Sequence, residues 1–255
     1  MKQKVRIAMG QMLVEGGELE ANLSRACEMI DHAGKEGCDV IVLPECLDLG
    51  WTYPGAGKLA HPIPGYCSER LCNAAKKSTI HVVAGLTEKS GKRLYNAAIV
   101  ISDKGEIILH HRKINELDFA LELYTSGQKL NACDTKLGKV GLAICADLRP
   151  EQNPLGHSLG LMGTTFLLSP CAWAVRPNHN NDSNPYGQEW IDPYREIALK
   201  YNMTVVGVSN VGPVTGGEWN GWKCIGCSLA IGPDGEILAQ GAYGDDAEEL
   251  LIFEV

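Results

Sequence analysis

Three side chains that can take part in covalent chemistry, Glu45, Lys113 and Cys145, each come at the end of a short apolar run. An apolar run of this length predicts a strand, and groups at the carboxyl ends of strands collect in the crevice where α/β proteins bind ligands. Cys145 is therefore a candidate nucleophile. The simpler alternative is a structural thiol, because free cysteines usually pack as small hydrophobic residues. The carboxylate and the ammonium, delivered in the same way, favour the catalytic interpretation.

These residues also form a joint pattern: Pro-Glu at the acid, Arg-Lys at the base and Cys-x-Asp-x-Arg from the thiol onward, in that chain order. The pattern resembles the nitrilase superfamily of carbon–nitrogen hydrolases, and the resemblance extends from the first predicted strand, residues 5–12, to the turn and strand at 232–238. It implies an α/β fold of four αββα layers, in which two mixed β-sheets pack face to face and helices cover them. It also implies a Glu45, Lys113 and Cys145 catalytic triad.

Cleavage of an amide needs a nucleophile, a proton carrier and stabilisation of the tetrahedral oxyanion. We expect Glu45 to take the proton of Cys145 and to return it to the departing amine, a role worth typically about 10² to 10⁴ in rate. Lys113 and a backbone N–H from the turn after Cys145 would stabilise the oxyanion, and loss of one such donor commonly costs about 3 to 4 kcal/mol. Lys113 would also favour ionisation of the thiol.

Four further residues are expected near the substrate. Trp51 lies in an irregular stretch, residues 46–65, and is a candidate for the pocket wall, although aromatic residues in loops often only anchor the loop. Glu122 and Tyr124 look like the glutamate and aromatic residue that the family places beside its active site, with Glu122 positioning Lys113 or the substrate. Trp173 resembles a tryptophan that family members place against the substrate.

The residues around the thiol, Cys145-Ala-Asp-Leu-Arg149, look like the family's amidase and carbamoylase branches rather than the Cys-Trp-Glu of nitrilases. We therefore predict hydrolysis of a non-peptide carbon–nitrogen bond in a small amide or N-carbamoyl compound through a cysteine acyl-enzyme. Asp147 and Arg149 are expected to support the turn as an ion pair. Ala146 departs from this resemblance, because members of the amidase branch often have a larger residue directly after the cysteine. A nitrilase acting on a small nitrile, acyl transfer to an amine, and a catalytically silent binding protein remain alternatives.

Two other motifs suggest different chemistry but lack the required context. Gly156-His-Ser-Leu-Gly160 matches the nucleophile elbow of α/β-hydrolases, yet no strand precedes it and no acid lies between Ser158 and the later His179. Cys224 and Cys227 are three apart, so in a strand they would face opposite sides of the sheet. No metal site and no cofactor are predicted.

The elements that would hold these groups can be predicted from hydrophobic periodicity. Apolar residues follow one stripe from Glu18 to Glu36, and similar helical patterns occur over 68–77, after Pro150 and over 186–201. Ser158 would lie on the helix after Pro150. Strands are predicted over 5–12, 39–43, 81–86, 95–101, 106–111, 139–144, 165–169, 203–209, 224–231, 236–240 and 250–255.

Composition limits the remaining possibilities. A chain of 255 residues, 45% hydrophobic, suits one domain over residues 1–255. The net charge of -8 without an extended basic cluster argues against nucleic acid or an anionic membrane as partner. The chain has no bilayer-length apolar run and no signal-peptide pattern, so we expect a soluble, cytoplasmic protein with reduced cysteines and a small-molecule amide substrate. The resemblance implies a homodimer or larger homo-oligomer, and the Leu- and Gly-rich stretch 154–162 suits close contact.

Overall fold

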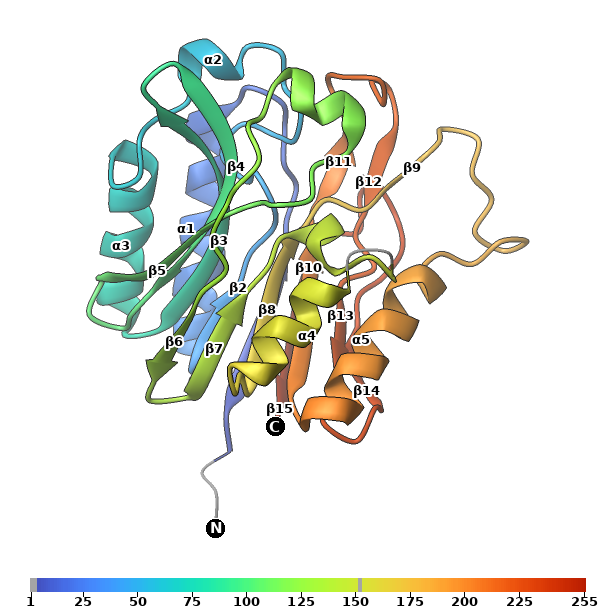
Figure 1. The fold of residues 1–255 in the computed structure, drawn as a ribbon. Helices are drawn as coiled ribbons and strands as arrows, with labels where there is room; N and C mark the ends of the chain where they lie inside the picture. Colours follow the sequence, from blue (N-terminus) through green and yellow to red (C-terminus); the bar gives the residue numbers. More distant parts are fainter. Residues whose placement is uncertain (1–3, 151–152) are drawn as a thin grey trace.

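Two six-stranded mixed sheets form the centre of the computed structural model, which describes residues 4–150 and 153–255 (Figure 1). The first sheet has the order β15 (Glu249–Glu254), β1 (Arg6–Gln11), β2 (Val40–Val42), β3 (His81–Ser90), β4 (Arg93–Ile101) and β5 (Ile107–Arg112). The second has the order β14 (Ile237–Gln240), β13 (Leu229–Ile231), β10 (Thr204–Ser209), β8 (Phe166–Cys171), β7 (Gly138–Leu142) and β6 (Ala132–Thr135).

The two sheets share one apolar core. Buried residues of the first sheet, such as Met9 and Val42, belong to the same cluster as Leu142 and Val206 of the second. Because side chains alternate along a strand, the other face of each sheet needs its own cover. Two further clusters provide it, one packing α1 (Leu19–Lys35) and α3 (Tyr66–Ser78) on the first sheet, the other packing α4 (Pro154–Leu161) and α5 (Gln188–Tyr201) on the second. The predicted four-layer αββα sandwich is confirmed.

Both sheets contain a parallel centre. In the first sheet, β1, β2 and β3 run parallel, and in the second, β7, β8 and β10 do so. The carboxyl ends of such strands meet at one edge of a sheet. Glu45 follows β2 and Cys145 follows β7, so the fold itself brings the ends of two separate sheets to the same region.

Some short elements differ from the prediction. The expected strand over 224–231 is divided into β12 (Lys223–Ile225) and β13, because Gly226 and Cys227 have φ angles of 65° and 59° that interrupt an extended backbone. Strand β12 joins β9 (Ala174–Val175) and β11 (Val211–Pro213) in a separate three-stranded sheet. The irregular stretch 46–65 contains a short helix, α2 (Ala56–Leu59), and a 3₁₀ helix, η1 (Asp118–Glu122), precedes the second sheet.

The described part of the chain contains no helix that is both long and apolar enough to cross a membrane.

Candidate active site

Glu45 is held in a tight turn after β2. The N–H of Gly85 donates to the carbonyl of Pro44 at 3.0 Å, and a Cβ on Gly85 would lie 2.6 Å from the Cα of Glu45. Only glycine permits this approach of β3 to the turn. The next residue, Cys46, has a φ of 45°, a conformation that L residues seldom adopt. The carboxylate is thus fixed by the backbone around it, with 1% of the side chain exposed.

Lys113 reaches the same point from the end of β5. Its N–H donates to the carbonyl of Asn96 at 2.8 Å, and its Nζ donates to Oε1 of Glu45 at 2.7 Å. The side-chain amide of Asn96, also buried, donates to the same Oε1 at 2.5 Å. Both recorded hydrogen bonds of the carboxylate therefore fall on one oxygen, which leaves Oε2 as the oxygen that can accept a proton.

Cys145 opens a 3₁₀ turn, η2 (Cys145–Leu148), directly beyond β7. Its φ is 45°, and its N–H donates to the hydroxyl of Ser169 at 3.1 Å. Unfavourable backbone angles of this kind concentrate at functional sites, where the surrounding structure enforces them. Among the described residues, no acceptor takes the N–H of the following residue, Ala146. This donor is available to a ligand beside the thiol.

The three groups line one small cavity of about 40 Å³. Aromatic side chains form much of its wall, a composition typical of small-molecule sites in which a few polar groups orient the ligand. The lining residues are Glu45, Trp51, Lys113, Leu117, Cys145, Ala146, Arg149, Ala172, Trp173, Ala174, Tyr186, Glu189, Trp190 and Trp219.

Burial and neighbouring charges set the protonation states in this cavity. A hydrogen bond with the thiol of Cys171, burial, and the nearby carboxylate of Glu45 raise the pKa of Cys145 well above its usual value, and Lys113 lowers it only in part. Lys113 thus favours ionisation of the thiol, as expected, but the other effects outweigh its charge and the free thiol stays protonated. Burial disfavours the charged form of Lys113, but Glu45 and then Glu116 outweigh it and keep the pKa of Lys113 well above normal.

Glu116 is a site residue that the sequence prediction missed. Its carboxylate lies 3.8 Å from Nζ of Lys113, is fully buried, and has no hydrogen-bond partner among the described residues. Burial, with Glu45 and Asp147 nearby, raises the pKa of Glu116 to about 8. The only signal in the sequence was an acid three residues after Lys113, in a segment without a regular period.

Asp147 joins the Cys145 turn to the Lys113 segment. Its carboxylate accepts the N–H of Ile144 at 3.0 Å on one side, and those of Ile114 and Asn115 at 3.1 and 2.8 Å on the other. Nε2 of His111, on β5, completes the set at 2.9 Å. Burial opposes the charge of Asp147, but these hydrogen bonds outweigh it and lower its pKa.

The other predicted site residues divide into two groups. Trp51, Trp173 and Arg149 line the cavity. Tyr124 does not: it is buried behind the Glu45 turn, where its hydroxyl accepts the N–H of Thr52 at 3.1 Å. The position expected for Glu122 is wrong, since its side chain is exposed beside a different surface hollow and Glu116 occupies the place next to Lys113.

The expected ion pair between Asp147 and Arg149 is also wrong. Asp147 points beneath the turn toward His111, whereas Arg149 faces the cavity, its guanidinium 6.0 Å from the ring of Trp190. The separation follows from the η2 turn. Two residues apart on a tight helical turn, side chains leave on different sides rather than the same face.

The competing motifs lie in other surroundings. Ser158 is on α4, as predicted, and its hydroxyl donates to the carbonyl of Pro154 at 2.8 Å, so it does not occupy an elbow. Cys224 and Cys227 are both free and buried. Within residues 4–150 and 153–255, no group of three His, Cys, Asp or Glu side chains is arranged to hold a metal ion.

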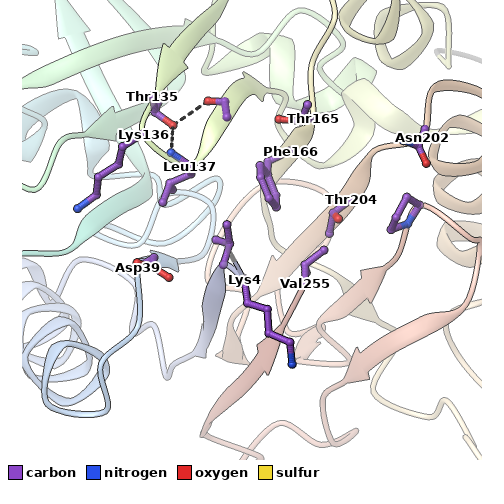
Figure 2. A pocket seen from close by; sticks show the side chains of 13 residues that line it. Lys4, Asp39, Thr135, Lys136, Leu137, Thr165, Phe166, Asn202, Thr204 and Val255 are labelled. Carbon is purple, nitrogen blue, oxygen red and sulfur yellow. Dashed lines mark hydrogen bonds between the residues drawn. The ribbon is translucent and has the colours of Figure 1, made fainter. Parts of the chain in front are cut away.

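A larger cavity, of about 660 Å³, lies at the amino end of β7, away from the thiol at its carboxyl end (Figure 2). Leu137, Phe166 and Val255 contribute apolar surface there. The lysines at its rim are engaged elsewhere, Lys136 with Asp103 at 2.8 Å and Lys4 with Glu254 at 3.1 Å. Its described lining contains no cysteine, serine or histidine, so the smaller cavity, which holds the thiol, is the candidate active site.

Comparison with known proteins places this geometry in context. The family model described as carbon-nitrogen hydrolase matches residues 6–255. A nitrilase homolog 2 from Dictyostelium discoideum is 32% identical over 185 residues, which are 68% of this chain and 56% of that protein. An omega-amidase NIT2 from Xenopus tropicalis is 28% identical over 247 residues, covering 93% of this chain and 84% of the relative.

Solved structures share the fold. Nit3 from Saccharomyces cerevisiae, a member of branch 10 of the nitrilase superfamily, superposes with a TM-score of 0.83 at 27% identity and covers 99% of this chain and 90% of its own. An amidase from Nesterenkonia sp. AN1, solved after Michael addition of acrylamide at its active-site cysteine, gives a TM-score of 0.82 at 16% identity, with 98% and 93% covered.

Proposed function

The chain belongs to the carbon–nitrogen hydrolase family of the nitrilase superfamily, and from this premise we propose that it hydrolyses the terminal amide of a small carboxylic acid through an acyl-enzyme on Cys145. One observation carries the proposal: a buried Glu45–Lys113 pair at 2.7 Å lines the same cavity as the thiol. Proton carrier, fixed positive charge and nucleophile are thus available to one bound molecule.

In the proposed reaction, Oε2 of Glu45 takes the proton of Cys145 as the sulfur attacks the amide carbon. A general base is needed because the raised pKa keeps the resting thiol protonated. The oxyanion receives hydrogen bonds from Nζ of Lys113 and from the N–H of Ala146. Collapse of the intermediate breaks the carbon–nitrogen bond, Glu45 returns its proton to the nitrogen, and ammonia leaves. Water, activated by Glu45, then releases the acid and restores the thiol.

Arg149 supports a substrate with a carboxylate. It lines the cavity and forms no ion pair with any carboxylate among the described residues. A planar guanidinium binds carboxylate oxygens in pairs and stays charged at all relevant pH values. Relatives of 26 to 28% identity are named omega-amidases, which is consistent with an amide at the end opposite an acid.

The test is ammonia release from a set of small amides, with the matched nitriles and N-carbamoyl amino acids as competitors. We expect turnover of an ω-amide by the wild-type protein and none by Cys145→Ala with an unchanged circular dichroism spectrum. Activity that survives in Cys145→Ala would overturn the proposal. A preference of more than about tenfold in kcat/KM for the nitrile, roughly 1.4 kcal/mol, would assign the site to nitrile hydrolysis instead.

A further inference from the structure

The cavity contains a second pair of opposite charges besides Glu45 and Lys113. Arg149 and Glu189 both line it, Arg149 just after the Cys145 turn and Glu189 in the first turn of α5. The two pairs differ in depth. Only 1% of each of the Glu45 and Lys113 side chains is exposed, whereas Arg149 is half-buried and Glu189 is exposed. The catalytic charges therefore lie at the closed end and the second pair at the mouth.

The two mouth charges do not neutralise each other. No ion pair within 4.0 Å joins Arg149 to Glu189, and neither forms one with another side chain that the structure describes. Glu189 also has no recorded side-chain hydrogen bond there, unlike its helix neighbour Gln188, which binds Asp192 at 2.7 Å. A cation and an anion that face one cavity without pairing complement a ligand that carries both signs.

Aromatic surfaces surround the same mouth. Trp190 stacks on Trp173 with ring centroids 4.9 Å apart, and its Nε1 donates to the hydroxyl of Tyr186 at 2.8 Å. All three rings line the cavity. The faces of aromatic rings attract cations, including ammonium groups of ligands. The guanidinium of Arg149 already lies 6.0 Å from the Trp190 ring, so this wall holds the cation of the mouth in place and leaves Glu189 as the group that would bind a positive charge on the ligand.

We infer that the substrate is the ω-amide of an α-amino acid, with Arg149 binding its carboxylate and Glu189 binding its ammonium. The inference rests on the proposed function and narrows its substrate class. An amino acid with a short amide side chain carries its two charges at one end and its amide at the other. The charged end would lie at the mouth of the cavity and the amide would lie at the thiol. N-carbamoyl amino acids and the monoamides of simple dicarboxylic acids lack the free ammonium that Glu189 would bind.

The experiment compares amides of equal length. L-glutamine carries both charges, 4-carbamoylbutanoate lacks the ammonium, and 4-aminobutanamide lacks the carboxylate; the asparagine series repeats the set with one methylene fewer. Ammonia release gives kcat/KM for each with the full chain. We expect the amino acid of the better series to exceed both truncated forms by at least tenfold. Glu189→Gln should bring the ratio of kcat/KM for the amino acid to kcat/KM for the analogue without an ammonium close to one. Asp192→Asn, on the same helix but outside the cavity, should leave this ratio unchanged.

The inference is overturned if 4-carbamoylbutanoate or its shorter analogue reacts as well as the amino acid, or if Glu189→Gln leaves the ratio unchanged. In either case turnover that depends on Cys145 would leave the proposed function standing. If no amide of either series releases ammonia in a Cys145-dependent way, the proposed function and the inference both fail.

Discussion

Lys113 is a buried ammonium between two carboxylates of different character. Glu45 binds it directly at 2.7 Å, whereas Glu116 lies 3.8 Å away and has a pKa raised to about 8. At neutral pH Glu116 is therefore mostly neutral, and Glu45 is the negative charge that Lys113 faces. Removing one member of a buried pair typically costs about 3 to 5 kcal/mol, since it leaves the other charge uncompensated. The arrangement preserves a positive charge where an oxyanion would form.

The first prediction concerns Glu116→Gln. Above about pH 8, Glu116 of the wild-type protein ionises and adds a negative charge beside Lys113, which weakens stabilisation of the oxyanion. We expect kcat/KM of the wild-type protein to fall on this alkaline side and that of Glu116→Gln to fall less, in a profile measured from pH 6 to 10. Identical alkaline limbs in the two proteins would show that Glu116 does not influence the reaction.

Stability should follow the same titration. The pKa of Glu116 is higher in the folded protein than its ordinary value of 4.5, so the unfolded chain ionises first and the contribution of this group to stability is lost between about pH 4.5 and 8. Glu116→Gln should lose less stability over that range than the wild-type protein. Urea unfolding at several pH values provides the measurement.

The sequence could predict which residues end a strand better than it could predict which way the side chains of an irregular segment face. Glu45, Lys113 and Cys145 were predictable as neighbours because each ends a strand, and strand ends converge. Glu116 and Glu122 are equally acidic and lie in one segment without a period, so nothing local distinguishes the buried side chain from the exposed one. Tertiary packing alone decides which of them faces Lys113.

At the scale of elements, the Asp147 carboxylate connects two strand ends from different sheets. It receives four hydrogen bonds. Three come from His111, Ile114 and Asn115 on the Lys113 side, and one comes from Ile144 on the thiol side. A displacement of either turn would leave buried donors without an acceptor. Correct spacing of Cys145 and Lys113 thus depends on a residue that does not touch the cavity.

The second prediction is therefore that Asp147→Asn lowers kcat more than it raises KM, because the triad loses alignment while the cavity wall remains. An amide can replace only part of the four-donor set, and hydrogen bonds to charged groups are worth about 1.5 to 3 kcal/mol each. We expect the free energy of unfolding, measured in urea, to fall by a few kcal/mol, on the order of one or two such bonds. Asp134→Asn, an exposed side chain on β6, is the control. Unchanged kcat in Asp147→Asn would contradict the positioning role.

Element prediction succeeded where a pattern was long and failed where it was short. The helix at α1 and the parallel strands were predictable from periodicity and apolar runs. Strands β9 and β12, of two and three residues, carry no such pattern and exist only because neighbouring strands pair with them. The break between β12 and β13 depends on positive φ angles at Gly226 and Cys227, and at Cys227, which is not a glycine, the sequence does not signal one.

At the scale of the molecule, the helices of the second sheet carry exposed apolar side chains. Leu161 at the end of α4 is 80% exposed, the following Met162 is 41% exposed, and Leu199 on α5 is 54% exposed. Figure 1 shows α4 and α5 side by side on the outer face of that sheet. A contact with another protein would bury these apolar side chains. Together with the expectation from the family, this leads us to propose a homodimer or larger homo-oligomer through α4 and α5.

The third prediction follows: the wild-type protein should sediment as an oligomer at micromolar concentration, and Leu161→Glu with Leu199→Glu should sediment as a monomer, because two charges would be buried unpaired at the contact. Leu121→Glu, at an exposed position on η1, should leave the oligomer intact. A wild-type monomer, or an oligomer that the double variant leaves unchanged, would refute this interface.

The central claim is that Cys145 becomes acylated, and intact-mass spectrometry after acid quench within the first turnover tests it most directly. With the best amide of the two series, we predict a mass increase equal to the acyl group, which disappears as ammonia and free acid accumulate and which maps to the peptide containing Cys145. Cys145→Ala should show no adduct. An adduct on any of the other nine cysteines would contradict the account. Full turnover by Cys145→Ala, which can form no adduct at this position, would contradict it as well.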